Sequence, residues 1–401
     1  DRTTETPASV GVAYAAAPPA KGDPATPPDA ALPDAVNDVG FELLGRIDSG
    51  DGNTVISPVS VAVALAMTAN GADGTTLDEM RSVLGLDAMT ELKSNESWAN
   101  LIASLEETGT TTLTLANSLW ADTGTEFKNS FLDADRDYFG AEVSTLDLQS
   151  PGAPGAINAW VGKNTRGKIT KIVGDIPELA VMYLVNATYF KGAWADEFSE
   201  QATRSAKFWR SNDLALDVSM MERGGMMDYV ETAQFQTVRL PYEGDSTAMY
   251  VILPAKGASV FDLVDSLDAD QIRQLRGSLK GRSGTLRMPK FTTRYERELS
   301  ADFKALGIAL AFAPESADFT RMADAEPGAL YIAGVNHKTF LAIDEKGTEA
   351  AAVTSIEMGA TGFEGSSAPP FTMVVDRPYL TLIVDERSGT VLFAGAIRDP
   401  Q

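Results

Sequence analysis

Residues 345–357 read EKGTEAAAVTSIE, and the interpretation of the whole chain depends on this stretch. As a strand, its alternate positions would form two faces: Thr348, Ala350, Ala352, Thr354 and Ile356 on one, and Glu349, Ala351, Val353, Ser355 and Glu357 on the other. Small side chains would let such a strand enter an existing sheet, because packed interiors tolerate little excess volume. The same residues also fit a surface loop or a modest Glu/Ala helix, so both interpretations stay open here.

Composition indicates one large domain. The chain has 401 residues, is 44% hydrophobic, and shows no internal repeat or linker between residues 34 and 401. No apolar run approaches the ~20 residues of a membrane span. The net charge of −23 argues against a nucleic-acid or anionic-membrane partner, since both require a basic surface.

Residues 1–33 differ from the rest. They contain seven of the 20 prolines together with many alanines, so we expect an extended tail and a domain over 34–401. The tail lacks a basic start and a long apolar run, and therefore does not read as a signal peptide. Its apolar patch at Val10, Val12, Ala13 and Tyr14 is a candidate docking segment, and a simple tether is the alternative.

Helical patterns dominate the first half of the domain. Residues 34–47 carry apolar side chains at helical spacing, and Ser57 before Pro58 predicts the start of a second helix that is apolar all round. Thr76 and Glu79 predict a capping box for a third helix. A further helix is expected to bury one face formed by Ile157, Trp160 and Val161.

Strand patterns dominate the second half. Residues 180–190, AVMYLVNATYF, are nearly all apolar, as in a central strand covered on both faces. The segment PYLTLIVDERSGTVLFAGAI predicts two buried strands joined by a turn at Arg387, Ser388 and Gly389. Together with the helices, these strands predict an α+β body.

Enzymatic machinery is poorly represented. The chain has no cysteine, which excludes a thiol nucleophile and a thiolate metal site, and its one histidine is His337. No nucleophile-elbow sequence or zinc-binding spacing accompanies that histidine. We therefore expect no enzyme activity, no metal and no cofactor.

Separated segments resemble the serpin family, the serine protease inhibitors, in the order that this family has them. They are EKGTEAAA from Glu345, NATYFKGAW from Asn186, LRMPKF from Leu286, ADFTRM from Ala317 and DRPYLTLIVDERSGTVLFAGAIRDP from Asp376. We expect the chain to be an inhibitory member of prokaryotic type. The resemblance implies the α+β serpin fold: a large mixed sheet, additional sheets, about eight to nine helices, and an exposed reactive-centre loop at about residues 345–371.

The resemblance also implies a function. A serine protease would cleave the loop and form its acyl-enzyme, and the loop would then enter the main sheet and trap the protease irreversibly. The alternative is a non-inhibitory serpin that acts as a carrier or storage protein. Thr348 and the three alanines of the hinge favour the inhibitor, because non-inhibitory relatives often carry charged, bulky or proline residues there. Family habit implies a monomer that is secreted or attached to the cell surface.

Particular positions match the family's functional residues. Trp194 matches the tryptophan where insertion begins, and Lys290 matches the lysine that pairs with Glu345, a pair expected to be exposed and worth ~0–1 kcal/mol. His337 matches a buried histidine that gates sheet opening, although a core histidine without a gating role is the alternative. The gating set is Ser57, Ser60, Asn186 and His337, and the hinge is Glu345, Gly347, Thr348, Glu349, Ala350, Ala351 and Ala352.

The scissile bond follows from the family's hinge spacing. It is placed at Thr361 and Gly362, with Ala360 and Phe363 as alternatives, because the loop from Gly362 to Arg377 is longer than usual. Ala360 and Thr361 favour elastase-like or subtilisin-like proteases, which accept small side chains. Phe363 would suit a chymotrypsin-like protease.

Overall fold

The computed structural model describes residues 21–48, 50, 52–106, 111–178, 180–210, 214–348 and 369–401. Within them lie nine α-helices, a π-helix and two 3-10 helices. The α-helices are α1 (Ala31–Ile47), α2 (Pro58–Ala69), α3 (Gly74–Val83), α4 (Glu91–Glu106), α5 (Asn129–Ala134), α6 (Ala153–Asn164), α7 (Val260–Asp265), α8 (Ala269–Ser278) and α9 (Ser300–Leu306). The shorter helices are η1 (Asp135–Phe139, the π-helix), η2 (Glu200–Ala202) and η3 (Leu310–Phe312).

One sheet has six strands in the order β10-β11-β12-β4-β2-β3. Their bounds are β10 (Phe291–Glu298), β11 (Gly334–Asp344), β12 (Gly347–Thr348), β4 (Met182–Ala193), β2 (Thr112–Asp122) and β3 (Glu142–Leu146). Parallel and antiparallel pairs are mixed in this sheet. β4 is almost wholly buried, which confirms the strand predicted at residues 180–190.

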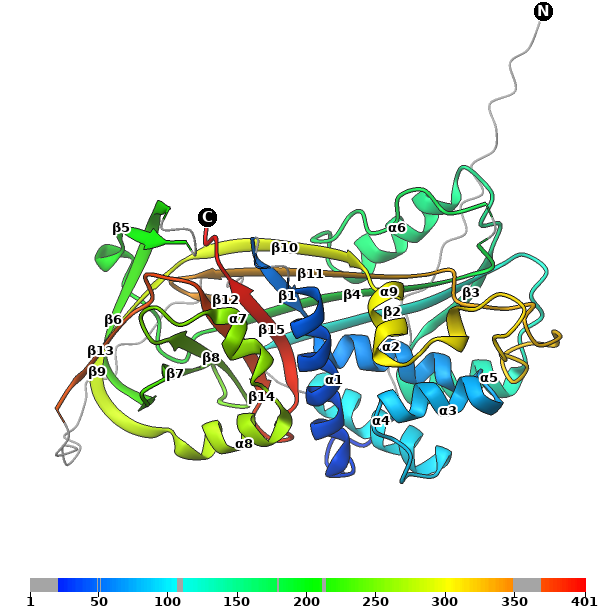
Figure 1. Cartoon of the computed structure of the whole chain (residues 1–401), viewed down its shortest axis with the longest axis horizontal. Coiled ribbons are helices and arrows are strands. Elements are labelled where there is room, and N and C mark those ends of the chain that lie inside the picture. The colour runs from blue at the N-terminus through cyan, green and yellow to red at the C-terminus, as the bar shows by residue number, and fades with distance from the viewer. Residues whose placement is uncertain are drawn as a thin grey trace, which may run out of the picture.

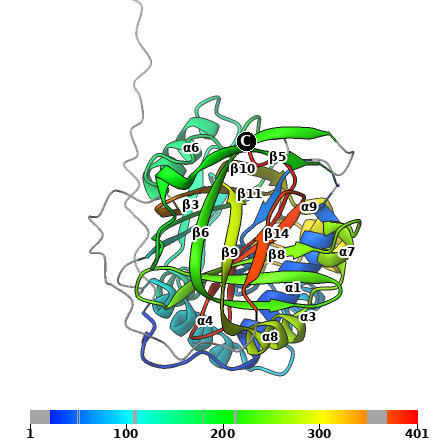
Figure 2. The ribbon, with the colours of Figure 1, turned by 90° about the vertical axis from the view of Figure 1, so that its left-hand side faces the viewer.

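The other sheet has nine strands, in the order β1-β15-β14-β8-β7-β6-β9-β13 with β5 paired to β6. Their bounds are β1 (Thr54–Ile56), β15 (Val391–Ile397), β14 (Tyr379–Asp385), β8 (Thr247–Pro254), β7 (Phe235–Pro241), β6 (Ala215–Glu231), β9 (Lys280–Pro289), β13 (Phe371–Val374) and β5 (Arg204–Trp209). Figure 1 shows the strands β5, β6, β9 and β13 of this sheet at the end of the molecule opposite the helices α3 and α4, and Figure 2 shows the sheet from that end.

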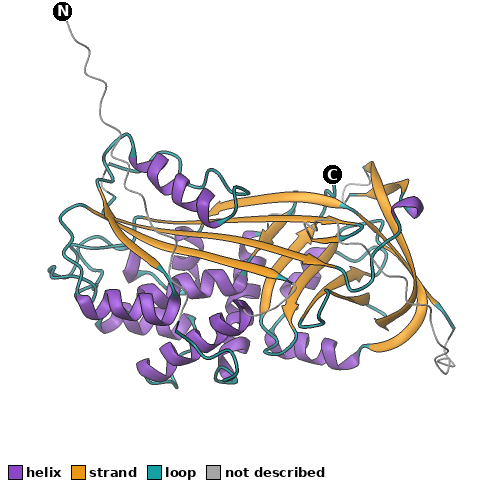
Figure 3. Ribbon diagram, turned by 180° about the vertical axis from the view of Figure 1, so that it is seen from behind, coloured by secondary structure: helices purple, strands orange, loops and turns teal. Residues whose placement is uncertain are grey.

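The helices cover the six-stranded sheet unequally. Figures 1 and 3 show α6 alone on one face and most other helices on the opposite face. Ile157, Trp160 and Val161 of α6 are buried, as predicted, in an apolar cluster that includes Trp120 and Phe340 of the sheet. Searched over the described residues, no helix is both long and apolar enough to cross a membrane.

Helix α2 lies at the centre of the main core. The Ser57 hydroxyl accepts a hydrogen bond from the Ser60 backbone N–H at 3.4 Å, and Pro58 occupies the first helical position. All residues from Pro58 to Ala69 are buried. The predicted start and the predicted all-round burial of this helix are both confirmed.

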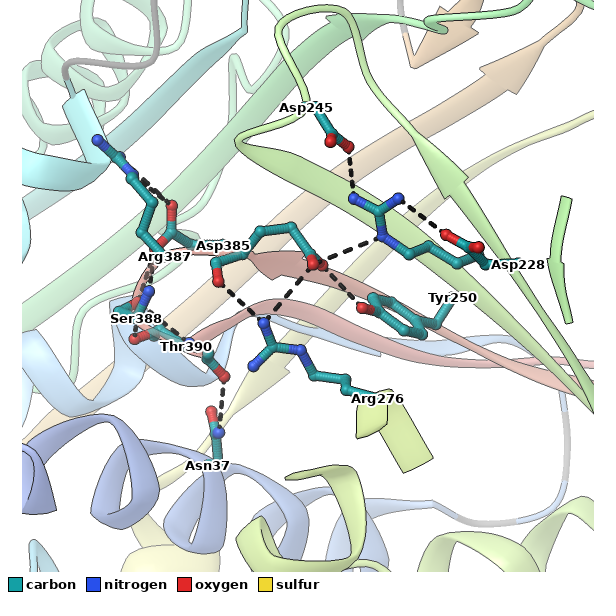
Figure 4. Close-up of polar contacts among 12 residues, drawn as sticks. Asn37, Asp228, Asp245, Tyr250, Arg276, Asp385, Arg387, Ser388 and Thr390 are labelled. Carbon is teal, nitrogen blue, oxygen red and sulfur yellow. Dashed lines mark hydrogen bonds and ion pairs between the residues drawn. The ribbon is translucent and has the colours of Figure 1, made fainter. Parts of the chain in front are cut away.

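The turn between β14 and β15 is confirmed at Arg387, Ser388 and Gly389. Figure 4 shows how it is held: the buried Asp385 carboxylate accepts hydrogen bonds from the Ser388 backbone N–H at 2.8 Å and from the Ser388 hydroxyl at 2.7 Å. Asn37 of α1 donates to the Gly389 carbonyl at 3.0 Å and accepts from the Val391 N–H at 2.8 Å. The first helix therefore fixes a turn more than 300 residues later.

The predicted capping box at Thr76 and Glu79 is wrong. Helix α3 begins at Gly74, and the capping side chain is that of Asp73. The Thr76 hydroxyl instead accepts from the Asp318 N–H at 3.0 Å, and Glu79 accepts from the N–H groups of residues 309 and 310 at 2.8 Å. Both side chains thus accept hydrogen bonds from backbone N–H groups of a distant segment. Local sequence cannot reveal such partners.

The predicted boundary at residue 34 falls inside the first helix. Helix α1 begins at Ala31 and buries Leu32 completely. Before it, the Asp29 N–H donates to the Ser97 hydroxyl at 2.8 Å, and the Lys21 N–H donates to the Asp137 carbonyl at 2.7 Å. Residues 21–30 are mostly exposed and contact the body through polar groups, whereas residues 31–33 form the start of α1. Residues 1–20, with the patch from Val10 to Tyr14, lie outside the described residues.

Candidate functional site

The candidate site is the seam between the central strands β4 and β11. Along most of its length these strands pair directly and in parallel, from Tyr183 with Gly334 to Tyr189 with Phe340. Beyond that point β12 lies between them: Thr348 pairs with Ile343 on one side and Gly192 on the other. The sheet is therefore open at one end, and the start of the predicted loop already occupies the opening.

Gly347 fits this position because it has no side chain. Its φ is +150°, and an added Cβ would lie 2.1 Å from the Gly192 carbonyl oxygen. Backbone in this conformation strongly favours glycine. The entry to the seam is therefore too narrow for any other residue without movement of β4.

Thr348 is completely buried and begins the apolar face predicted for the hinge. Its hydroxyl lies 2.5 Å from the hydroxyl of Tyr242, whose pKa is raised strongly by burial. The Tyr242 ring stacks on Trp194 with ring centroids 4.6 Å apart and an interplanar angle of 14°. The first inserted side chain thus has a hydrogen-bond partner deep in the protein.

Trp194 lies at the same end of the seam. Its indole N–H donates to the Asp344 carbonyl at 3.0 Å, and its backbone N–H donates to the Lys346 carbonyl at 2.9 Å. These bonds fix the turn that connects β11 to β12. The structure therefore places Trp194 where the resemblance expects insertion to begin.

Lys290 and Glu345 form an ion pair beside this turn, with Lys290 Nζ 3.0 and 3.3 Å from the two carboxylate oxygens. The Thr203 hydroxyl donates to the same carboxylate at 2.7 Å. Burial by itself raises the pKa of Glu345, but these hydrogen bonds, with one from its own backbone, lower it below its ordinary value. The prediction of an exposed pair is wrong on one side, because the Glu345 side chain is only 8% exposed.

His337 lies in the directly paired part of the seam, opposite Asn186, and is completely buried. Its Nε2 accepts a hydrogen bond from the Ser57 backbone N–H at 3.3 Å. Its Nδ1 therefore carries the proton and donates to the Asn186 side-chain oxygen. Only neutral imidazole satisfies both bonds, and burial lowers the pKa of His337 to about 3.

The Asn186 amide completes the link between the sheet and α2. Its nitrogen donates to the Ser60 carbonyl at 2.6 Å and also contacts the Ser60 hydroxyl and the Asn117 side-chain oxygen. β11, β4, β2 and the start of α2 are thus joined by buried hydrogen bonds. Separation of β4 from β11 along its whole length would break the bond between His337 and Asn186.

Several predicted residues lie outside the described residues. They are the hinge positions Glu349, Ala350, Ala351 and Ala352 and the scissile-bond candidates Ala360, Thr361, Gly362 and Phe363. Three contributors were not predicted at all: Tyr242, Thr203 and Asn117. Tyr242 and Asn117 lie within two further segments that resemble the family, LPYEG from Leu240 and LANSLWAD from Leu115, whereas Thr203 carries no signal that separates it from surface polar residues.

Comparisons with known proteins identify the family. A family model described as Serpin (serine protease inhibitor) matches residues 34–400. Neuroserpin from Gallus gallus is 33% identical over 367 residues, which cover 88% of this chain and 87% of the relative. The chain therefore belongs to the serpin family, a family of serine protease inhibitors.

Solved structures agree with this assignment. The thermophilic serpin tengpin in its native state has a TM-score of 0.85 and 30% identity, covering 94% of this chain and 97% of its own. Human thyroxine-binding globulin, solved with thyroxine, has a TM-score of 0.84 and 26% identity, covering 92% and 99%. The expected α+β serpin fold is confirmed.

Proposed function

We propose that this protein inhibits serine proteases irreversibly, as a substrate that traps the enzyme. The protease cleaves the loop that follows β12, and the freed segment extends β12 along the seam between β4 and β11. The acyl-enzyme is carried with it and is distorted before it can be hydrolysed. The observation that supports this most is β12 itself, which already pairs with both strands.

The register of β12 indicates which residues would follow. Thr348 pairs with Ile343 in antiparallel register, so continuation would set residues 349–357 opposite Ala342 down to Gly334. The alternate small residues Ala350 and Ala352 would then share the buried face of Thr348. This alternation is what insertion into a packed sheet requires.

Energetics favour the inserted form. About ten newly paired residues would gain ~0.5–1.5 kcal/mol for each hydrogen bond, in addition to apolar burial. That total is comparable with the ~5–15 kcal/mol stability of an ordinary domain. The form with an uncleaved loop must therefore be held by a kinetic barrier.

Incubation with an elastase-like protease, followed by a denaturing gel, tests the proposal. The expected result is a covalent complex that survives denaturation, together with a fragment cut after Thr361. Complete cleavage of the loop without a complex would reject trapping. A productive cut at Ser366 or later would reject only the register of the scissile bond.

A carrier function is the second candidate, because human thyroxine-binding globulin, a structural neighbour, is solved with a small molecule bound. The same gel separates the two functions, since a carrier would be cleaved without forming a complex. The buried small residues Gly347 and Thr348 at the start of the hinge favour the inhibitor.

A further inference from the structure

Two grooves lie on either side of the short helix α7, and both expose apolar side chains. The larger, of about 930 Å³, lies between α7, α8, the start of β7 and the end of β8 (Figure 1). Its apolar lining is formed mainly by Phe235, Ile252, Leu263, Leu267 and Leu275. Phe235, Leu263 and Leu267 pack against the main core but are only half-buried. Apolar surface that gathers in one exposed place marks an interaction site.

The smaller groove, of about 680 Å³, lies between α7 and α1. Phe41 of α1 and Phe261 of α7 contribute aromatic rings to it, and Phe261 is 37% exposed. Leu267 and Asp268 line both grooves, so the two meet at the turn between α7 and α8. We call their combined surface the α7 groove.

The length of α7 explains why this surface is not covered. The Ser266 hydroxyl donates to the Leu263 carbonyl at 2.7 Å where α7 ends, and the Asp268 carboxylate accepts from the Gln271 N–H at 2.7 Å where α8 begins. The six residues between these two ends of α7 make less than two helical turns. So short a helix fills only the middle of the surface and leaves a groove on each side.

Carboxylates line the α7 groove. They are Asp38, Glu42, Asp262, Asp265, Asp268 and Asp270. Of the described residues that line it, Arg46 alone is a cation, and its guanidinium donates to the Ala305 carbonyl at 2.6 Å. Asp270 forms an ion pair with Arg273. Within the part of the chain that the structure describes, Asp262, Asp265 and Glu42 have no ion pair, so the groove carries uncompensated negative charge.

The titration of Asp38 agrees with this crowding of charge. Partial burial raises the pKa of its carboxyl, and repulsion from Asp268, Asp34 and Asp270 raises that pKa further. The Ala269 N–H donates to the same carboxylate at 2.7 Å and opposes the rise. A cation bound in the groove would relieve the repulsion.

We propose that the α7 groove binds a cationic amphipathic helix supplied by another polypeptide. The apolar face of that helix would lie on Phe261 and Leu267, and its Lys or Arg side chains would face the carboxylates. This is a binding function beyond protease inhibition, and it does not involve the loop between β12 and β13.

Size favours an extended ligand. The two grooves, of about 930 and 680 Å³, together exceed the ~300–1,000 Å³ of a pocket that encloses a small molecule. An amphipathic helix presents several apolar anchors and several cations along its length, which one small cation cannot do. It therefore matches both the apolar lining and the distributed carboxylates.

Charge argues against occupants supplied by this chain itself. A second copy has a net charge of −23, and a two-fold contact would bring the same carboxylates against this surface. Residues 1–20 contain a single basic residue, Arg2, and cannot neutralise the groove.

Titration of the uncleaved, full-length protein with a fluorescent helical peptide tests the proposal. The peptide has about 18 residues, roughly five turns, with Leu on one face and Lys on the other. Two peptides of the same length are controls, one with Glu in place of Lys and one with Ser in place of Leu. We expect the Leu/Lys peptide to bind at least ~10-fold more tightly than either, and its binding to weaken with added salt.

Variants locate the contact. Asp262→Asn combined with Asp265→Asn should weaken binding about 5-fold. Asp175→Asn combined with Glu178→Gln, at exposed positions after α6, removes the same charge elsewhere and should leave binding unchanged. Phe261→Ser should weaken binding about 10-fold, whereas Leu92→Ser, at a 58% exposed position of α4, should not.

The controls decide between this surface and a general attraction. Equal weakening by the two paired variants, or equal affinity for the Ser-containing peptide, would overturn the α7 groove as the binding site. Octylamine, a single cation on an apolar chain, would overturn the extended ligand if it bound as tightly as the peptide. Unfolding midpoints are measured without peptide, and the paired Asp→Asn variant decides the outcome if Phe261→Ser lowers the midpoint.

Discussion

The loop is attached to the body at two roots, β12 before it and β13 after it, and these two strands are held in different ways. β12 enters the six-stranded sheet with a glycine and a small buried residue, Gly347 and Thr348, and its approach is held by the polar contacts of Glu345. β13 ends the nine-stranded sheet with a stacked aromatic ring at Phe371. The first root can be extended without a large side chain having to pass, whereas the second is fixed by a side chain that must be pulled out.

Because of this difference, the N-terminal root can be extended into the sheet more easily than the C-terminal root can be released. Small side chains lower the barrier to sliding between strands, and a stacked, fully packed ring raises the barrier to leaving. Under the proposed function, the segment freed by a cut therefore stays attached at the root that can extend into the sheet. The predictions below test whether the N-terminal root behaves in this way.

Thr348→Arg should have the largest effect. A charge at this fully buried position would stop the strand from extending, so the protein should be cleaved without forming a complex, with at least a 10-fold loss of trapped protease per cleaved loop. Thr372→Arg is the control, because Thr372 is exposed on β13. Titration of inhibitor against protease measures the amount of protease trapped per cleaved loop. Equal amounts for the two variants would contradict the proposed difference between β12 and β13.

Gly347→Ala should destabilise the intact protein by about 2–3 kcal/mol, because the new Cβ would collide with the Gly192 carbonyl oxygen. Gly225→Ala provides the control: its φ is +132°, but nothing lies within 4 Å of an added Cβ. Denaturant unfolding measures both. If Gly225→Ala costs as much, backbone conformation alone explains the effect and the narrow entry does not.

His337 should make the seam sensitive to acid. Its pKa is depressed in the folded protein to about 3 from the ordinary 6.5, so its stabilising contribution is present above about pH 6.5 and is lost as the pH falls towards 3. At ~1.4 kcal/mol per pH unit, the wild type should lose about 2 kcal/mol more than His337→Gln between pH 7 and pH 5.

Subtraction of the two pH profiles isolates His337, the one histidine of the chain. The buried Asp135, whose pKa is raised well above its ordinary value by burial, acts in the opposite direction and is common to both proteins. Parallel profiles of unfolding free energy would show that the histidine does not titrate with unfolding.

Lys290→Met should have the smallest effect, about 1 kcal/mol. It removes one of the partners of the buried Glu345 carboxylate, but Lys290 itself is 40% exposed and the Thr203 hydroxyl remains. Arg287→Ala, which breaks an exposed pair between Arg287 of β9 and Glu222, serves as the reference. Equal unfolding free energies for the two variants would mean that burial of Glu345 does not strengthen its ion pair with Lys290.

Sequence predicted the parts of this molecule whose causes are local or periodic. The start of α2 at Ser57 and Pro58 and the buried run of β4 follow from residues that are neighbours in the chain. Thr76 and Glu79 look like a capping box, yet they bond to residues more than 200 positions away. A local pattern cannot show which of two partners a side chain will choose.

The residues of the candidate site likewise include some that sequence predicted and some that it could not predict. Alternation predicted a two-faced hinge, of which the structure describes only the beginning up to Thr348, and family resemblance pointed to His337, Asn186 and Trp194. The packing around β13 could not be predicted, because Tyr229, Arg282 and Phe371 come from three strands that are far apart in sequence. The reason for a glycine at position 284 is evident only from the structure, in which the Phe371 ring lies against it.

The most direct test of the account is the distance between the two sides of the loop before and after cleavage. Because the chain has no cysteine, Glu357→Cys and Thr372→Cys introduce two unique labelling positions, and a spectroscopic distance between spin labels can be measured in the same molecule. The account predicts that cleavage shifts the whole distribution to longer distances, as residue 357 moves to the Gly334 end of the seam while β13 stays in place. A distribution that keeps its centre after complete cleavage would contradict it.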